Sequence, residues 1–116
     1  MTSRRNRSLL TFVGAAILWY FAAITPSTAT AGSPDPARIT VEGFMFNPMA
    51  LTVKAGSTVI WTNMDDDPHT VISDTGLFRS GAMDTNDSFS FKFDKPGTYR
   101  FICSIHPRMV GTIVVQ

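Results

Sequence analysis

The chain has 116 residues, of which 44% are hydrophobic and 16% charged, and its formal net charge is +1. A chain of this length holds one domain at most, because domains usually take about 100–200 residues. The small net charge argues against a polybasic nucleic-acid-binding protein, and a single cysteine excludes an intramolecular disulfide framework. With one Cys, two His and six Met, any chemistry must come from very few side chains.

Residues 1–31 have the pattern of an export signal peptide. A basic Arg-Arg-Asn-Arg segment at 4–7 precedes an apolar run from 9 to 24, and Ala29-Thr30-Ala31 is a small-residue cleavage sequence. The alternative is an uncleaved membrane anchor, but the run is short for a span of about 20 apolar residues. The paired Arg4-Arg5 hints at twin-arginine export without deciding between that route and Sec.

Cleavage after residue 31 would change the length and the net charge of the chain. It leaves 85 residues with seven basic and nine acidic side chains, a net charge of −2. We therefore expect a small periplasmic domain with no membrane segment in its mature form. Residues 32–37 are expected to be a flexible leader, because Gly, Ser and Pro dominate them.

The remaining chain, residues 38–116, has a β pattern throughout. Apolar and polar residues alternate over 39–42, 51–54, 57–63, 89–94, 99–103 and 112–115. Such segments, separated by Gly and Pro turns every 8–12 residues, predict an all-β sandwich or small barrel. The irregular connections at 64–70 and 73–86 are where functional residues are expected, because loops carry function more often than the scaffold does.

The residues with metal-binding side chains gather in two connections. Cys103, His106 and Met109 form a C-x-x-H-x-x-M pattern between the last two predicted strands, and His69 lies in an earlier loop. A thiolate, two imidazoles and a thioether are the ligand set of blue-copper electron-transfer sites, in which the Met is weak and axial. Singly, each residue could be an inert buried thiol, a loop histidine or core filler. Together they favour one metal centre.

Other interpretations of these residues remain open. A structural zinc site can use two nitrogens and a sulfur, although an axial Met is unusual for zinc. A Cys103–His106 thiol hydrolase would need a third orienting group and an oxyanion hole. Copper enzymes need a further copper with its own histidines, and the chain has only two, so we expect no enzyme. A second site built from thioethers is less favoured than core and edge filling; its candidates are Met45, Met49 and Met64.

Two longer segments around the candidate ligands carry a family resemblance. They are Trp61-Thr62-Asn63 with Pro68-His69-Thr70-Val71, and Pro96-Gly97-Thr98-Tyr99 with Phe101, Cys103, His106-Pro107 and Met109. Over about residues 38–116 the chain resembles the cupredoxins, and among them most the amicyanins. The short copper loop carries that narrower likeness: two residues separate the Cys from the His, and two separate the His from the Met. Plastocyanins and pseudoazurins have a longer gap before the Met.

The resemblance implies a Greek-key β-sandwich with a single type 1 (blue) copper at one end. The strong ligands would be His69, Cys103 and His106, with Met109 axial. Asn63 would donate its backbone N–H to the Cys103 sulfur, and its side chain would brace Ser104, which together would tune the metal.

These inferences favour an exported, mobile electron carrier that cycles one copper between Cu(I) and Cu(II). His106 would present its ring edge at the surface, where redox partner proteins dock transiently. Amicyanins usually carry a bulky apolar residue where this chain has Arg108, so the docking surface would be smaller or more basic. The acidic run at 65–67 is more simply a solvated loop than a patch that steers a basic partner.

We expect a monomer with no nucleic-acid partner. The alternative function is a periplasmic copper-binding module for storage or delivery, which would use the same ligands.

Overall fold

A computed structural model describes residues 11, 13–26 and 35–116 of the chain. The chain divides into two units, Met1–Ala31 and Gly32–Gln116. In the first unit, the described residues have no regular secondary structure. Among the described residues, there is no helix long and apolar enough to cross a membrane. The basic segment at 4–7 and the cleavage sequence at 29–31 lie outside the described residues, so the signal peptide stays a prediction.

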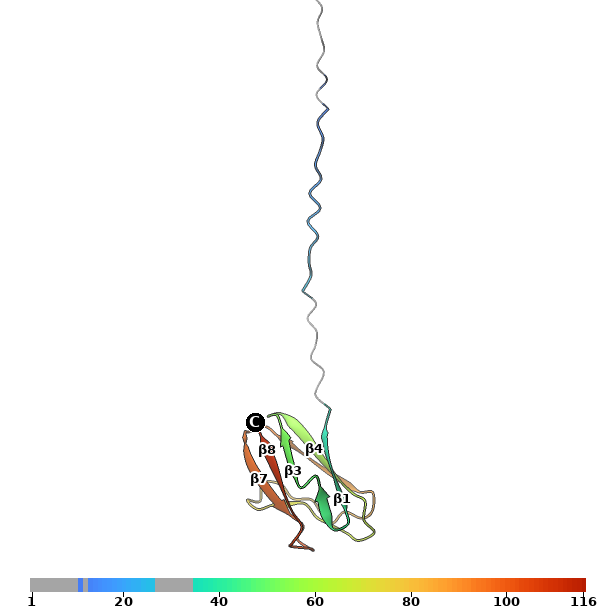
Figure 1. The fold of residues 1–116 in the computed structure, drawn as a ribbon, viewed down its shortest axis with the longest axis vertical. Helices are drawn as coiled ribbons and strands as arrows, with labels where there is room; N and C mark the ends of the chain where they lie inside the picture. Colours follow the sequence, from blue (N-terminus) through green and yellow to red (C-terminus); the bar gives the residue numbers. More distant parts are fainter. Residues whose placement is uncertain (1–10, 12, 27–34) are drawn as a thin grey trace, which may run out of the picture. The chain divides into compact units, whose positions relative to one another are not determined.

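Residues 35–116 form an all-β sandwich, as predicted, and contain no helix. The eight strands are β1 (Ala37–Glu42), β2 (Met45–Asn47), β3 (Ala50–Val53), β4 (Ser57–Asn63), β5 (Ile72–Ser73), β6 (Ser88–Phe93), β7 (Gly97–Ile102) and β8 (Val110–Val115). One sheet has the order β2-β1-β4-β6 and the other β3-β8-β7-β5. Figure 1 shows β3, β8 and β7 side by side in one layer, with β1 and β4 in the other.

The strand pairings mix two directions. β1 runs parallel to β4, and β3 runs parallel to β8, whereas the remaining neighbours are antiparallel. Parallel neighbours cannot be joined by a tight hairpin, so the chain crosses between the two sheets to make them. Such crossovers close the sandwich around one core.

The structure differs from the predicted elements at four places. β2 and β5 were not predicted, because strands of three and two residues are too short to show an alternating pattern. Ala37, which was expected in the flexible leader, opens β1 and pairs with Val59. Cys103, which was expected on a strand, lies one residue beyond the end of β7.

Aromatic side chains dominate the core between the sheets. Trp61 is fully buried and packs against Phe101 at right angles, with ring centroids 5.4 Å apart. The rings of Phe78 and Phe93 also contact this indole. Because large rings packed at near-crystalline density resist displacement, this core is a rigid base for the loops at the end of the sandwich.

Two loops are fixed at one end of this base. His69 forms an isolated bridge with Met83, since the N–H of each donates to the other's carbonyl, at 3.1 and 2.8 Å. The loop from Cys103 to Met109 is closed by the Cys103 N–H, which donates to the Met109 carbonyl at 3.1 Å. This loop lies at the end of the domain opposite the C-terminus (Figure 1). The fold therefore places both candidate ligand loops together.

Candidate metal centre

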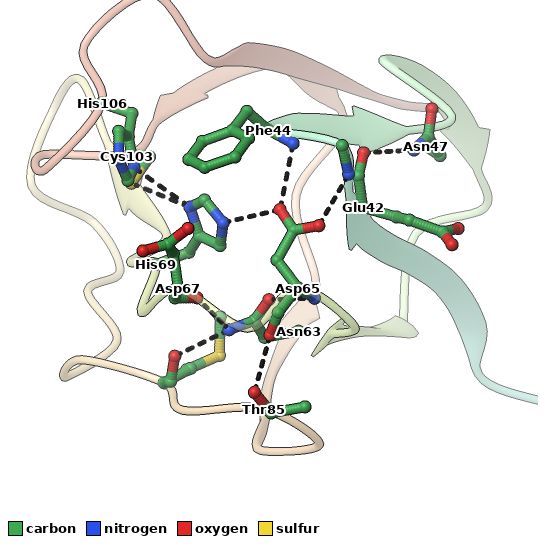
Figure 2. Close-up of polar contacts among 12 residues, drawn as sticks. Glu42, Phe44, Asn47, Asn63, Asp65, Asp67, His69, Thr85, Cys103 and His106 are labelled. Atoms are coloured by element: carbon green, nitrogen blue, oxygen red, sulfur yellow. Dashed lines mark hydrogen bonds and ion pairs between the residues drawn. The ribbon is translucent and has the colours of Figure 1, made fainter.

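The structure brings His69, Cys103 and His106 into one group. The Cys103 Sγ lies 3.8 Å from the Nδ1 of His69 and 3.8 Å from the Nδ1 of His106. The two Nδ1 atoms are 3.2 Å apart. Figure 2 shows dashed contacts from the ring of His69 to Cys103 and His106. His69 lies 34 positions before Cys103 in the chain, yet the fold brings its donor atom beside those of Cys103 and His106.

The size of this triangle is suited to a metal ion. A circle through three atoms with these separations has a radius of about 2.1 Å. Metal–nitrogen bonds measure about 2.0–2.1 Å and metal–thiolate bonds about 2.3 Å. A metal could therefore lie close to the plane of the three donors at ordinary bond lengths, which fits the trigonal His₂Cys arrangement that copper takes in blue sites.

The fourth predicted ligand, Met109, lies at the end of the same loop. Its side chain is 5% exposed, and its N–H donates to the His106 carbonyl at 2.8 Å. Cys103 and His69 are fully buried, whereas His106 is only partly buried. Thus His69, Cys103, His106 and Met109 are positioned to form a copper site, and His106 is the one of the four that is not buried.

The environment of Cys103 favours its thiolate form. Burial alone would raise the pKa of this thiol, but the backbone N–H groups of Thr70 and His106 and the two imidazoles outweigh it and lower the pKa to about 6. The Thr70 N–H donates to Sγ at 3.4 Å. Since a soft metal binds the thiolate and not the thiol, this is the ionisation state that a copper site requires.

The predicted role of Asn63 is wrong in both of its parts. Its backbone N–H donates to the Asp87 carbonyl at 2.9 Å, not to the Cys103 sulfur. Its side chain does not contact Ser104; it donates to the carbonyls of Asp67 and Met83, at 2.8 and 2.9 Å. Asn63 therefore pins the loop that carries the first histidine to the neighbouring loop, and acts on the site only through that loop.

Thr70 takes the place that was predicted for Asn63. Besides its N–H contact to the sulfur, its hydroxyl accepts from the Ser104 N–H at 2.8 Å and shares a hydrogen bond with the Ser104 hydroxyl at 2.9 Å. Ser104 is thus braced as predicted, but by a different residue. The sequence could have indicated this role only through position, because Thr70 directly follows a predicted ligand, His69.

Asp65 is a site residue that sequence reasoning missed. Its Oδ2 lies 2.8 Å from the Nε2 of His69 and accepts from the Phe44 N–H at 3.0 Å, and its Oδ1 accepts from the Gly43 N–H at 2.7 Å (Figure 2). Burial tends to raise the pKa of this carboxyl, but these donors outweigh it and hold the pKa below its usual value. Within the acidic run at 65–67, only its spacing of four residues from the histidine sets it apart.

Phe44 is a second residue that was not predicted. Its ring meets the ring of His69 at 81° with centroids 5.4 Å apart, and that of His106 at 86° and 4.9 Å. It is nevertheless 46% exposed. Phe44, Ile105, His106, Pro107, Arg108 and Met109 line a shallow hollow on the surface. The site is thus covered on its solvent side by an aromatic ring from the β1–β2 turn.

Of the filling of core and edge gaps that was favoured for three methionines, only the edge part is found, because none of the three is buried in the core. Met45, Met49 and Met64 are each about half exposed, at 50%, 52% and 48%. The first two line a small surface hollow together with Met109. Edge positions of this kind leave their thioethers accessible to solvent and partners.

Comparisons with known proteins agree with the geometry. The model of the cupredoxin-like domain family matches residues 14–115. Amicyanin-alpha of Methylorubrum extorquens is 36% identical over 98 residues, which cover 76% of each chain. A purple cupredoxin from Nitrosopumilus maritimus has a similar structure, with a TM-score of 0.64 and 33% identity, over 69% of this chain and 99% of that one.

A Cu(I) form of an amicyanin variant is also similar, with a TM-score of 0.67 and 29% identity, over 70% of this chain and 82% of that one. The family match covers most of the chain, and the likeness to a copper-loaded protein agrees with the donor set found here. The chain belongs to the cupredoxin-like family, and its site is that of a single copper ion.

Proposed function

We propose that the protein is an exported, mobile electron carrier built around one type 1 copper. The observation that carries this proposal is the triangle of donor atoms from His69, Cys103 and His106, of the size that a metal ion needs. In the proposal these three residues would hold the copper strongly, and the thioether of Met109 would be a fourth, weaker ligand. Bound copper supplies a one-electron couple between Cu(I) and Cu(II), and a site of this kind performs no catalysis of its own.

The protein contributes a site that changes little between the two oxidation states. Cys103 and His69 are fully buried and Met109 nearly so, which excludes water from the donors. Backbone hydrogen bonds join His69 to Met83 and close the loop from Cys103 to Met109. The Thr70 hydroxyl links the two ligand loops through Ser104. Preorganised ligands on a rigid scaffold keep the structural rearrangement small when an electron arrives or leaves.

The partly exposed ring of His106 is the proposed electron port. Around it, Phe44 and Ile105 are 46% and 47% exposed, and Arg108 lines the same hollow. A small apolar surface with a cationic rim suits a transient redox partner, since weak electron-transfer complexes bury little area. Asp65 is engaged in internal hydrogen bonds, so any steering of a basic partner by the acidic run would come from its two exposed members, Asp66 and Asp67.

Export is proposed from the pattern of residues 1–31, which would direct the domain to the periplasm as a soluble monomer after cleavage. Although an exported location is oxidising, a single thiol is tolerated there because metal ligation and burial protect Cys103 from oxidation.

The visible spectrum of the purified protein loaded with Cu(II) tests the copper assignment. The expected result is intense visible absorption from the Cys103–copper bond, which Cys103→Ser abolishes and Ser80→Ala, at a buried hydroxyl outside the ligand set, retains. A colourless Cu(II) form of the wild-type protein would overturn the proposal.

Voltammetry and electron-exchange rates separate the carrier from the delivery function. A reversible couple with fast exchange supports the carrier. Tight Cu(I) binding without fast exchange would instead favour copper storage or delivery.

A further inference from the structure

The turn between β1 and β2 has an unusual backbone. Glu42 pairs with Met45, so Gly43 and Phe44 alone form the hairpin loop. Both have positive φ, at 62° and 57°. Two-residue loops with this geometry favour Asn-Gly or Gly-Gly, because a bulky side chain is strained in the left-handed region. Phe44 is therefore held in an unfavourable conformation, which persists only where surrounding contacts over-determine it.

The contacts that hold Phe44 come from the metal centre. Its ring packs edge-on against both imidazoles. Its N–H and that of Gly43 donate to the two carboxylate oxygens of Asp65, at 3.0 and 2.7 Å. These contacts join a turn and a loop more than 20 residues apart in the chain. The strain of the turn is thus offset by the ring contacts and by one carboxylate that accepts from both N–H groups of the turn.

The same carboxylate contacts a ligand. Asp65 Oδ2 lies 2.8 Å from the Nε2 of His69, whose ring is fully buried, while the Asp65 side chain is only 12% exposed. A carboxylate only accepts hydrogen bonds, so Nε2 carries the proton and donates. The Nδ1 of His69 is then left with a lone pair that points to Cys103 and His106 (Figure 2). Carboxylates that accept from a ligating imidazole orient it and strengthen it as a donor.

We propose that Asp65 is the positioning residue of the copper centre, fixing His69 through Nε2 while holding the Gly43–Phe44 turn over both histidines, and that its negative charge favours Cu(II) over Cu(I). This inference rests on the proposed copper site. Asp65 touches neither the metal nor a partner; it acts through His69 and the turn.

The test compares Asp65→Asn with Asp66→Asn in the copper-loaded protein. Both variants remove one negative charge from the same loop, but Asp66 is exposed and makes no contact with the site. Outer partners of metal ligands are commonly worth about 10–100-fold. We expect Asp65→Asn to shift the redox equilibrium at least about tenfold toward Cu(I), which is about 59 mV for a one-electron couple. We expect Asp66→Asn to shift it by less than about threefold, because exposed charges are screened.

Equal shifts in the two variants, or a shift of Asp65→Asn toward Cu(II), would overturn the inference. A wild-type protein without a blue-copper spectrum would instead overturn the proposed function, so the two failures are distinguishable.

Hydrogen exchange tests the positioning role without copper. In the metal-free wild-type protein, we expect the amide protons of Gly43 and Phe44 and the Nε2 proton of His69 to exchange slowly. In Asp65→Asn, the amide of Gly43 should exchange at least about tenfold faster, because local opening governs exchange. Fast exchange of all three protons in the wild-type protein would refute the role of Asp65 even if the variant does not fold.

Discussion

Replacement of Gly111 by alanine should destabilise the domain, because the new methyl group has no room between the sheets. Gly111 pairs with Phe101 across β7 and β8 and lies on the buried face of its strand. A Cβ at this position would stand 2.3 Å from the Phe101 Cζ and 2.6 Å from its Cε2. Carbon atoms in contact are normally about 3.5–4.0 Å apart, so the ring would have to move by more than about 1 Å.

The ring of Phe101 has little freedom to move. It is fully buried, with Phe46 at a centroid distance of 4.7 Å and Trp61 at 5.4 Å. Overpacking a core typically costs about 1–3 kcal/mol, and an enclosed ring places this case near the upper end. The smaller backbone entropy of alanine in the unfolded chain returns about 0.4–1 kcal/mol. The expected net loss is about 2 kcal/mol, or about 8–16 °C in Tm for a domain of this size.

Thermal and chemical unfolding of the metal-free protein measure this effect without the contribution of metal binding. Gly81→Ala is the matched control, because nothing lies within 4 Å of its Cβ position, and it should raise stability by about 0.4–1 kcal/mol through the unfolded-state entropy alone. Phe101→Leu removes the ring edge, so combining it with Gly111→Ala should reveal a favourable coupling of at least about 1 kcal/mol. A loss below about 0.5 kcal/mol for Gly111→Ala alone would refute the steric argument.

Three further predictions concern the site. Thr70→Val removes the acceptor of the Ser104 N–H while keeping the N–H contact to Cys103, so we expect the free energy of unfolding to fall by about 1–3 kcal/mol. An unchanged midpoint of chemical unfolding would argue against the bracing role. Arg108→Glu, in the hollow beside His106, should slow oxidation of the reduced protein by hexacyanoferrate(III), less so at high salt; equal rates at low salt would contradict a cationic rim. Removing copper with a chelator should lower Tm, since free metal at about 100 times Kd stabilises by about 2.7 kcal/mol; identical calorimetric traces would mean that the folded site does not bind it.

Much of the fold could be predicted because the strands are half-buried. In β4, for example, residues 59, 61 and 63 are buried and alternate with partly exposed ones, and this pattern is visible in the sequence. Strands as short as β2 and β5 have no such pattern, and the parallel pairing of β1 with β4 depends on contacts that no local segment encodes.

The candidate ligands could be predicted because metal binding depends on residue type. One thiol and two imidazoles leave few ways to build a centre, and the spacing of Cys103, His106 and Met109 fixes three of the donors on one loop. The hydrogen-bond partners around them could not be predicted in the same way. Asn63 and Thr70 both stand near the buried histidine, and only the path of the loop decides which N–H reaches the sulfur.

The sequence by itself therefore determined the class of the fold and the set of donor atoms, because alternation and residue chemistry are local properties. Only the tertiary structure decided what surrounds the donors. Asp65 differs from Asp66 and Asp67 because the packing of β1 against β4 brings the Gly43–Phe44 turn and the His69 loop to the same carboxylate. A contact between segments more than 20 residues apart depends on how the sheets assemble, so it cannot be predicted from the residues next to Asp65 in the sequence.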